Sequence, residues 1–124
     1  MFTTSDAAAV LNAGRGTAYA AWTPYFCAFT ASPTDTGSFT SEVVGGGYAR
    51  QAVTLAVPAT KATNNTTQLT FTATAGTVIT HVGLADALTA GSLRRYVALG
   101  TAVTVGSSGQ VTVAATTGLT DTFA

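Results

Sequence analysis

The chain has 124 residues, of which 47% are hydrophobic and only 8% are charged, and its formal net charge is zero. This length predicts one domain with a sizeable buried core. Soluble domains usually carry roughly 25% charged residues, so the composition argues against a solitary, freely soluble enzyme. A neutral chain without a basic patch also argues against nucleic acid and anionic membranes as partners, and near-zero net charge favours association with other proteins.

Residues 1–15 predict one short helix. Ser5 is a candidate N-cap, Asp6 falls in the electropositive first turn, and Gly14 is placed to end the helix. The N-terminus lacks the basic and apolar regions of a signal peptide, and no stretch approaches the ~20 apolar residues of a membrane span. We therefore expect the chain to be made in the cytoplasm.

From Thr17 onward, short runs rich in Val, Thr, Tyr and Phe are separated by Gly, Pro, Asn and Ser, which is typical of all-β proteins. The expected strands are residues 20–22, 25–30, 50–57, 67–74, 78–86, 93–105 with a break near Gly100, and 110–115. The expected turns are residues 32–38, 62–65, 89–92 and 106–109, the last as a hairpin connection.

Two of these strands show clear alternation. In residues 68–73 and 110–114 the apolar side chains fall on one face and most of the threonines on the other. No linker or internal repeat divides the chain. We therefore predict a single all-β domain over residues 1–124, an antiparallel, jelly-roll-like β-sandwich with one short N-terminal helix.

The most distinctive motif is a run of three glycines: Gly45, Gly46 and Gly47. A dinucleotide or phosphate loop would place its glycines between a strand and a helix, whereas a strand is expected after these. We predict a structural turn, in which the glycines adopt positive φ and allow a close backbone approach, and Tyr48 packs against the fold. Glu42 and Arg50 are expected to pair across the turn or to reach a neighbouring subunit; at an exposed site the pair would stabilise by ~0.2–1 kcal/mol.

Three further residues are candidate contact residues. His81 alternates with apolar residues along an expected strand, and catalysis would require a nucleophile and an orienting acid beside it. We expect it to make a hydrogen bond or an interface contact instead. Arg94 and Arg95 are too few for a nucleic-acid patch, so they are expected to mark a strand edge or to pair with a partner's carboxylate.

The remaining chemistry-bearing residues predict packing. Cys27 is the only cysteine, so no disulfide can form within the chain, and it is expected to be a buried small hydrophobe. The aromatic residues near the first strands favour core packing over a sugar-binding platform; they are Trp22, Tyr25, Phe26 and Phe29. No catalytic residue, cofactor site or metal site is predicted.

Residues 28–33 (AFTASP), 42–51 (EVVGGGYARQ) and 80–86 (THVGLAD) occur in the order found in a family of small virion proteins of tailed bacteriophages. The sequence resembles this family, commonly labelled phage tail fibre or hypothetical phage protein, over nearly the whole chain. It departs from the family at Ala85, where Phe is frequent, and in the less regular segment 118–124.

The resemblance implies a non-enzymatic structural role in the virion, with synthesis in the cytoplasm of the bacterial host. Low charge and threonine-rich strand faces favour a capsid decoration, or cement, protein docked on the major capsid protein. The alternatives are a tail, tail-tip or fibre component that contacts other virion proteins, and a carbohydrate-binding host adhesin. Closed symmetry favours a homo-oligomer, either a dimer or a trimer.

Overall fold

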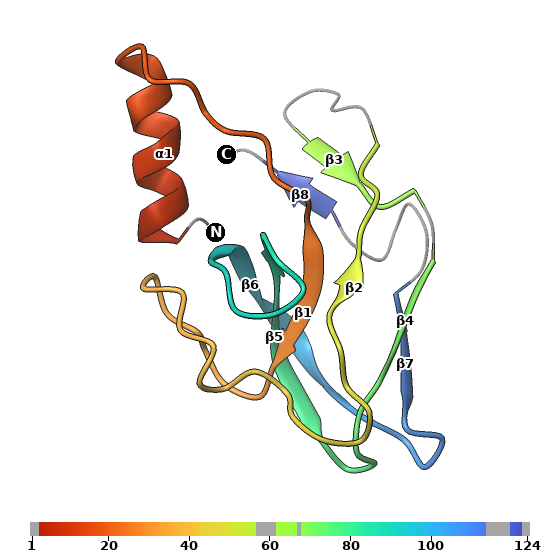
Figure 1. Ribbon diagram of the computed structural model, residues 1–124. Coiled ribbons are helices and arrows are strands. Elements are labelled where there is room, and N and C mark those ends of the chain that lie inside the picture. The colour runs from red at the N-terminus through yellow and green to blue at the C-terminus, as the bar shows by residue number, and fades with distance from the viewer. Residues whose placement is uncertain (1–2, 57–61, 67, 114–119, 123–124) are drawn as a thin grey trace.

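The computed structural model describes residues 3–56, 62–66, 68–113 and 120–122. In this part of the chain the helix and strands are α1 (Thr4–Gly14), β1 (Tyr25–Phe29), β2 (Gln51–Ala52), β3 (Ala62–Asn64), β4 (Leu69–Thr72), β5 (Val78–Ala85), β6 (Leu93–Thr104), β7 (Gln110–Val113) and β8 (Thr120–Thr122). All strand pairs are antiparallel (Figure 1). The predicted all-β sandwich with one short helix is confirmed, while its jelly-roll connectivity stays a prediction.

The main sheet has four strands in the order β2-β1-β5-β6. Its inner strand β1 has the sequence YFCAF, and the last four of its residues are buried. Because successive side chains of a strand point to opposite faces, this continuous apolar run supplies two cores. Phe26 packs with Phe71 of β4 on one face, with ring centroids 5.5 Å apart, and Phe29 stacks on Phe39 on the other.

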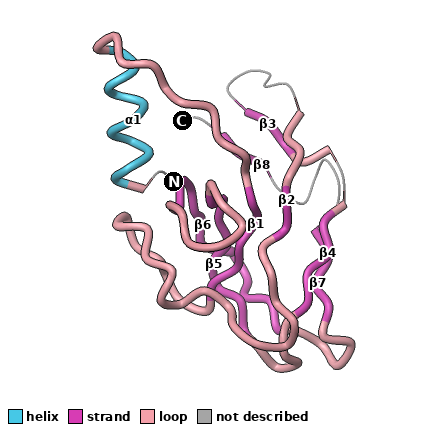
Figure 2. The backbone as a smooth tube through the Cα atoms, viewed as in Figure 1, coloured by secondary structure: helices cyan, strands magenta, loops and turns pink. Residues whose placement is uncertain are grey.

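The strands β4 and β7 form a second, two-stranded sheet, and β3 and β8 form a third (Figure 2). In β4 the side chains of Leu69 and Phe71 are buried and that of Thr70 is exposed, so the alternation predicted for this strand is confirmed. Residues 106–109 lead from β6 in the main sheet to β7 in the second sheet. The hairpin expected there is wrong, because this turn joins two layers.

Some expected strands are shorter or absent. Residues 20–22 form no strand, since Trp22 is held by side-chain contacts and Pro24 has no N–H to donate to a ladder. The strand expected at residues 50–57 is paired with β1 only over β2, because β1 begins at Tyr25, opposite Ala52. Residue 57 lies outside the described residues, as do residues 67, 114 and 115 of two other expected strands.

Two elements reverse the sequence-based expectation. The turn expected at residues 62–65 is strand β3, which pairs with the distant β8 from Ala62 to Asn64, so long-range pairing overrides the local turn signal. The break expected near Gly100 is an irregularity within one continuous strand. Ile79 of β5 lies opposite Val103, yet His81 lies opposite Ala98, so β6 holds extra residues at that point.

The helix α1 is attached mainly through its N-terminal end. Thr3, rather than the expected Ser5, is the N-cap: its hydroxyl accepts a hydrogen bond from the Asp6 backbone N–H and donates to the backbone oxygen of Leu93 at 2.6 Å. Asp6 is the only helix residue that is fully buried, whereas Leu11 is 72% exposed. Figure 1 accordingly shows α1 at the side of the sheets, with its first turn nearest β6.

Candidate functional site

The segment that contains Gly45, Gly46 and Gly47 forms a loop that leaves β1 and returns to it. Before it, the backbone N–H of Val43 donates to the carbonyl of Ala28 at 3.0 Å, and after it β2 returns to the same strand, with Gln51 opposite Phe26. Between these contacts the chain crosses to the end of β4. The turn therefore connects the main sheet to the second sheet, which is the structural role that the motif predicts.

The glycines are required by backbone geometry. Their φ angles are +83° at Gly45, +64° at Gly46 and +79° at Gly47. A Cβ added to Gly46 would lie only 2.2 Å from the backbone nitrogen of Thr74. Both predicted reasons for glycine, positive φ and close backbone approach, are confirmed at this position.

Glu42 and Arg50 form a bidentate ion pair below this turn. The Nε and Nη2 atoms of Arg50 each donate to a different Glu42 carboxylate oxygen at 2.8 Å. The Arg50 side chain is 5% exposed and the Glu42 side chain 13% exposed. Glu42 and Arg50 therefore pair with each other across the turn, which was one of the two expected arrangements. Because the pair is buried, the stabilisation of ~0.2–1 kcal/mol that applies to an exposed ion pair does not apply to it.

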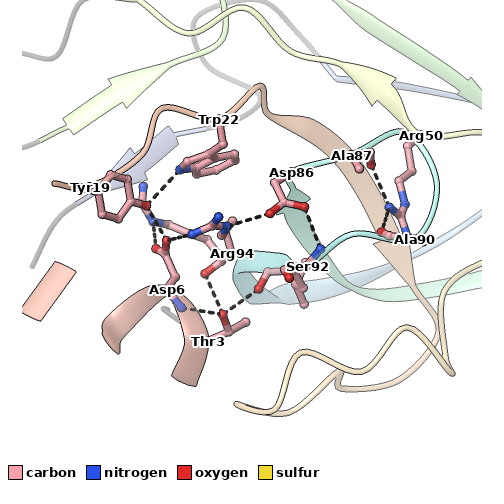
Figure 3. Close-up of polar contacts among 12 residues, drawn as sticks. Thr3, Asp6, Tyr19, Trp22, Arg50, Asp86, Ala87, Ala90, Ser92 and Arg94 are labelled. Atoms are coloured by element: carbon pink, nitrogen blue, oxygen red, sulfur yellow. Dashed lines mark hydrogen bonds and ion pairs between the residues drawn. The ribbon is translucent and has the colours of Figure 1, made fainter. Parts of the chain in front are cut away.

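Arg50 also fixes the loop that joins β5 to β6. Its Nη1 atom donates to the carbonyl oxygens of Ala87 and Ala90, each at 2.8 Å (Figure 3). Its guanidinium carbon lies 4.2 Å from the centroid of the Phe39 ring, a cation–π geometry. The hydrogen bonds to Glu42 raise the pKa of Arg50, so the side chain remains a cation.

Tyr48 links the ion pair to both layers. Its hydroxyl accepts a hydrogen bond from the Ala28 backbone N–H at 3.0 Å and donates to Glu42 at 2.9 Å. Its ring meets the Phe71 ring of β4 edge-on at 6.0 Å. Burial raises the pKa of Tyr48, which keeps the hydroxyl protonated and able to donate to the carboxylate.

An open depression of about 450 Å³ lies over this cluster. Glu42, Tyr48 and Arg50 line it together with apolar residues of the turn and of the β5–β6 loop. On its rim, Val44 is 84% exposed and Leu88 is 53% exposed. The polar groups of the floor are already satisfied by one another, so the depression offers mainly an apolar contact surface.

Arg94 and Arg95 belong to a second polar cluster, between α1 and β6. The fully buried carboxylate of Asp6 accepts from Arg94 Nη1 and from Arg95 Nε, each at 3.2 Å (Figure 3). Arg94 Nε also donates to Asp86 at 3.1 Å. Both arginines thus pair with carboxylates of their own chain, not a partner's, and β6 is the outer strand of its sheet, as the edge interpretation expects.

Trp22 and Tyr19 complete the second cluster. The Tyr19 hydroxyl donates to Asp6 and accepts from the Trp22 indole N–H (Figure 3). The Trp22 ring lies within 5.6 Å of the Arg94 guanidinium carbon and packs against the core. Trp22 is therefore a packing residue, and its ring does not form a free sugar-binding face. Asp6 is the centre of this cluster, a role that local sequence patterns do not indicate, because its arginine partners lie 88 and 89 positions away.

His81 and Cys27 make no side-chain hydrogen bond to either cluster among the contacts seen in the described residues. His81 lies on β5 between Phe29 and Ala98, and its Nδ1 is 2.8 Å from the Thr80 hydroxyl. Cys27 is fully buried as predicted, and burial raises the pKa of its thiol to about 12. Among the described residues, no three His, Cys, Asp or Glu side chains are grouped to hold a metal ion. In the same part of the chain, no helix has the length and apolarity to cross a membrane.

We predict that Gly46→Ala lowers the free energy of unfolding by about 2–4 kcal/mol, because it adds both positive-φ strain and a clash with the end of β4. The matched control is Gly76→Ala: φ at Gly76 is +87°, but a Cβ there meets nothing within 4 Å. We expect the control to cost about 1 kcal/mol from backbone strain alone. Urea denaturation measures both values, and equal losses would contradict the close-approach explanation.

Arg50→Lys should lower the free energy of unfolding by about 2–4 kcal/mol, since one ammonium group cannot satisfy both Glu42 oxygens and the carbonyls of Ala87 and Ala90. Arg15→Lys is the control, because Arg15 is exposed and hydrogen-bonds only to Asn12 among the contacts seen. The control should change stability by less than about 0.5 kcal/mol in the same urea titration. A tolerated Arg50→Lys would show that bidentate pairing is dispensable.

Asp6→Asn should destabilise the fold by about 2–4 kcal/mol, because it removes the buried charge that pairs with two arginines. Asp86→Asn removes the other carboxylate that pairs with Arg94; because Asp86 is 18% exposed whereas Asp6 is fully buried, this change should cost less than Asp6→Asn. Thermal unfolding followed by circular dichroism compares the variants. If Asp86→Asn proved the more damaging, the helix would not be anchored through Asp6.

A comparison with protein families gives a match that covers residues 1–120. The matching family is described as "Podophage GP4 fiber I protein gp80". No curated protein matches the sequence. Since the match extends over almost the whole length, it supports the resemblance to phage virion proteins and a bacteriophage structural role. The chain belongs to the podophage GP4 fiber I protein gp80 family.

Proposed function

We propose that the chain is a non-enzymatic structural component of a podophage fibre, working in the virion after synthesis in the bacterial host cytoplasm. The observation that carries this proposal is the family match over residues 1–120, whose description names a fibre protein. That description favours the tail or fibre alternative over capsid decoration. Decoration of the major capsid protein stays a prediction that the family name does not support.

The internal use of the charged groups supports a structural role. Glu42 and Arg50 bind each other and the backbone of the β5–β6 loop, and Asp6 binds Arg94 and Arg95. The one thiol, of Cys27, is buried and has a raised pKa, which suits packing rather than nucleophilic chemistry. In this proposal the chain needs no cofactor, nucleic acid or membrane.

The depression over the glycine turn is the surface we assign to contact with another virion protein. Val44 and Leu88 expose apolar area on its rim, above a floor that is held rigid by the Glu42–Arg50 pair. Exposed apolar groups on a rigid support are typical of protein–protein contact surfaces.

Immunogold electron microscopy of whole particles tests the place of the chain. Antibodies raised against the purified protein should label the tail or its fibres. Particles of the same phage with the gene deleted serve as the control for antibody specificity. Labelling confined to the head would overturn the fibre proposal and would support capsid decoration instead.

A further inference from the structure

The outer part of β6 is exposed to an unusual degree for a strand of a main sheet. β6 is the last strand in the order β2-β1-β5-β6, so in the described part of the chain only β5 is paired with it. Every residue from 97 to 104 is exposed except Leu99, which is half-buried; Val97 is 50% exposed and Val103 is 40% exposed. Apart from Leu99, which packs against the core, the side chains of this segment and its outer edge therefore face solvent.

The free edge begins where the contacts of α1 end. The backbone N–H of Thr3 donates to the carbonyl of Arg94 at 3.0 Å, which covers the first residues of β6. Beyond Arg95 no comparable contact from another segment to the outer edge is seen among the described residues. The stretch from Tyr96 to Thr104, which is exposed apart from the side chains of Tyr96 and Leu99, would extend over roughly 30 Å at the usual rise per strand residue.

This edge lacks the side chains that usually prevent pairing with another chain. Natural edge strands are protected by lysines, inward-pointing charges, proline, bulges or a covering segment, and residues 96–104 (YVALGTAVT) contain no charged residue and no proline. The register shift places extra residues of β6, between Ala98 and Val103, opposite the single residue Thr80 of β5, and no backbone hydrogen bond from another described segment is seen on the outer side of β6 there. The backbone along this edge is therefore accessible to a further strand.

The chemistry of the edge fits a second copy of this chain. The nearest charges, on Arg94 and Arg95, are already paired with Asp6 and Asp86, so a copy of β6 would meet no unpaired like charge there. The formal net charge of the whole chain is zero, so two copies do not repel each other at long range. An uncharged strand laid antiparallel to itself is complementary to itself, as a two-fold interface requires.

We propose that the chain forms a homodimer in which β6 pairs edge to edge with β6 of a second copy, antiparallel about a two-fold axis. Backbone hydrogen bonds between the two strands join the main sheets of both copies into one continuous sheet. Val97 and Val103 then gain cross-strand neighbours on the strand of the other copy. This inference concerns self-association and does not rest on the fibre assignment.

Sedimentation equilibrium of the purified chain tests the proposal, with Thr101→Lys and Thr101→Asp as variants. Thr101 is exposed and lies next to Gly100, the middle residue of the free edge, so the two-fold axis brings both copies of it close together. The wild type should sediment as a dimer at micromolar concentration. Each variant alone should weaken the dimer about tenfold or more through like-charge repulsion, and mixing the two variants should restore a heterodimer.

Ser108→Lys is the matched control, because it adds the same charge on the exposed β6–β7 turn, outside the strand. It should leave the dimer constant unchanged. Circular dichroism of each variant shows whether it is folded. A monomeric wild type, an assembly that both Thr101 variants leave intact, or a mixture of the variants that stays monomeric would each overturn the proposal.

Discussion

The buried ion pair between Glu42 and Arg50 is the constraint on which the connection between the layers depends. It joins the edge of β1 to the loop between β5 and β6, and Tyr48 extends it to β4 of the second sheet. Burying two charges is costly unless their geometry and remaining hydrogen bonds are satisfied. Here both carboxylate oxygens and three guanidinium nitrogens have partners, so the pair specifies one path for the turn above it.

Pairing of charged side chains within the chain also accounts for how the few charged residues of the sequence are used. The ion pairs seen in the described residues involve only Asp6, Glu42, Arg50, Asp86, Arg94 and Arg95, and each side chain is less than a quarter exposed. These charges therefore serve internal attachment, of α1 in one cluster and of the glycine turn in the other. What remains on the surface is largely uncharged, which suits a protein that works among neighbours in a particle.

Local patterns were sufficient to predict part of this structure. The apolar run of β1, the alternation of β4 and the need for glycine at Gly46 follow from period-two packing and backbone sterics. Long-range contacts were not predictable: β3 forms because β8 lies beside it, and Asp6 finds its arginines across most of the chain. The pairing of Glu42 with Arg50 was one of two stated alternatives, because sequence proximity cannot show whether a pair is buried.

The central claim is that Glu42 and Arg50 stabilise the fold through each other rather than separately. A double-mutant cycle measures this directly, using Glu42→Ala, Arg50→Ala and the double variant in urea denaturation. We predict a coupling free energy of about 2 kcal/mol or more, since either single truncation leaves a buried charge without its partner. A coupling free energy near zero, with the two single losses adding up in the double variant, would contradict the claim.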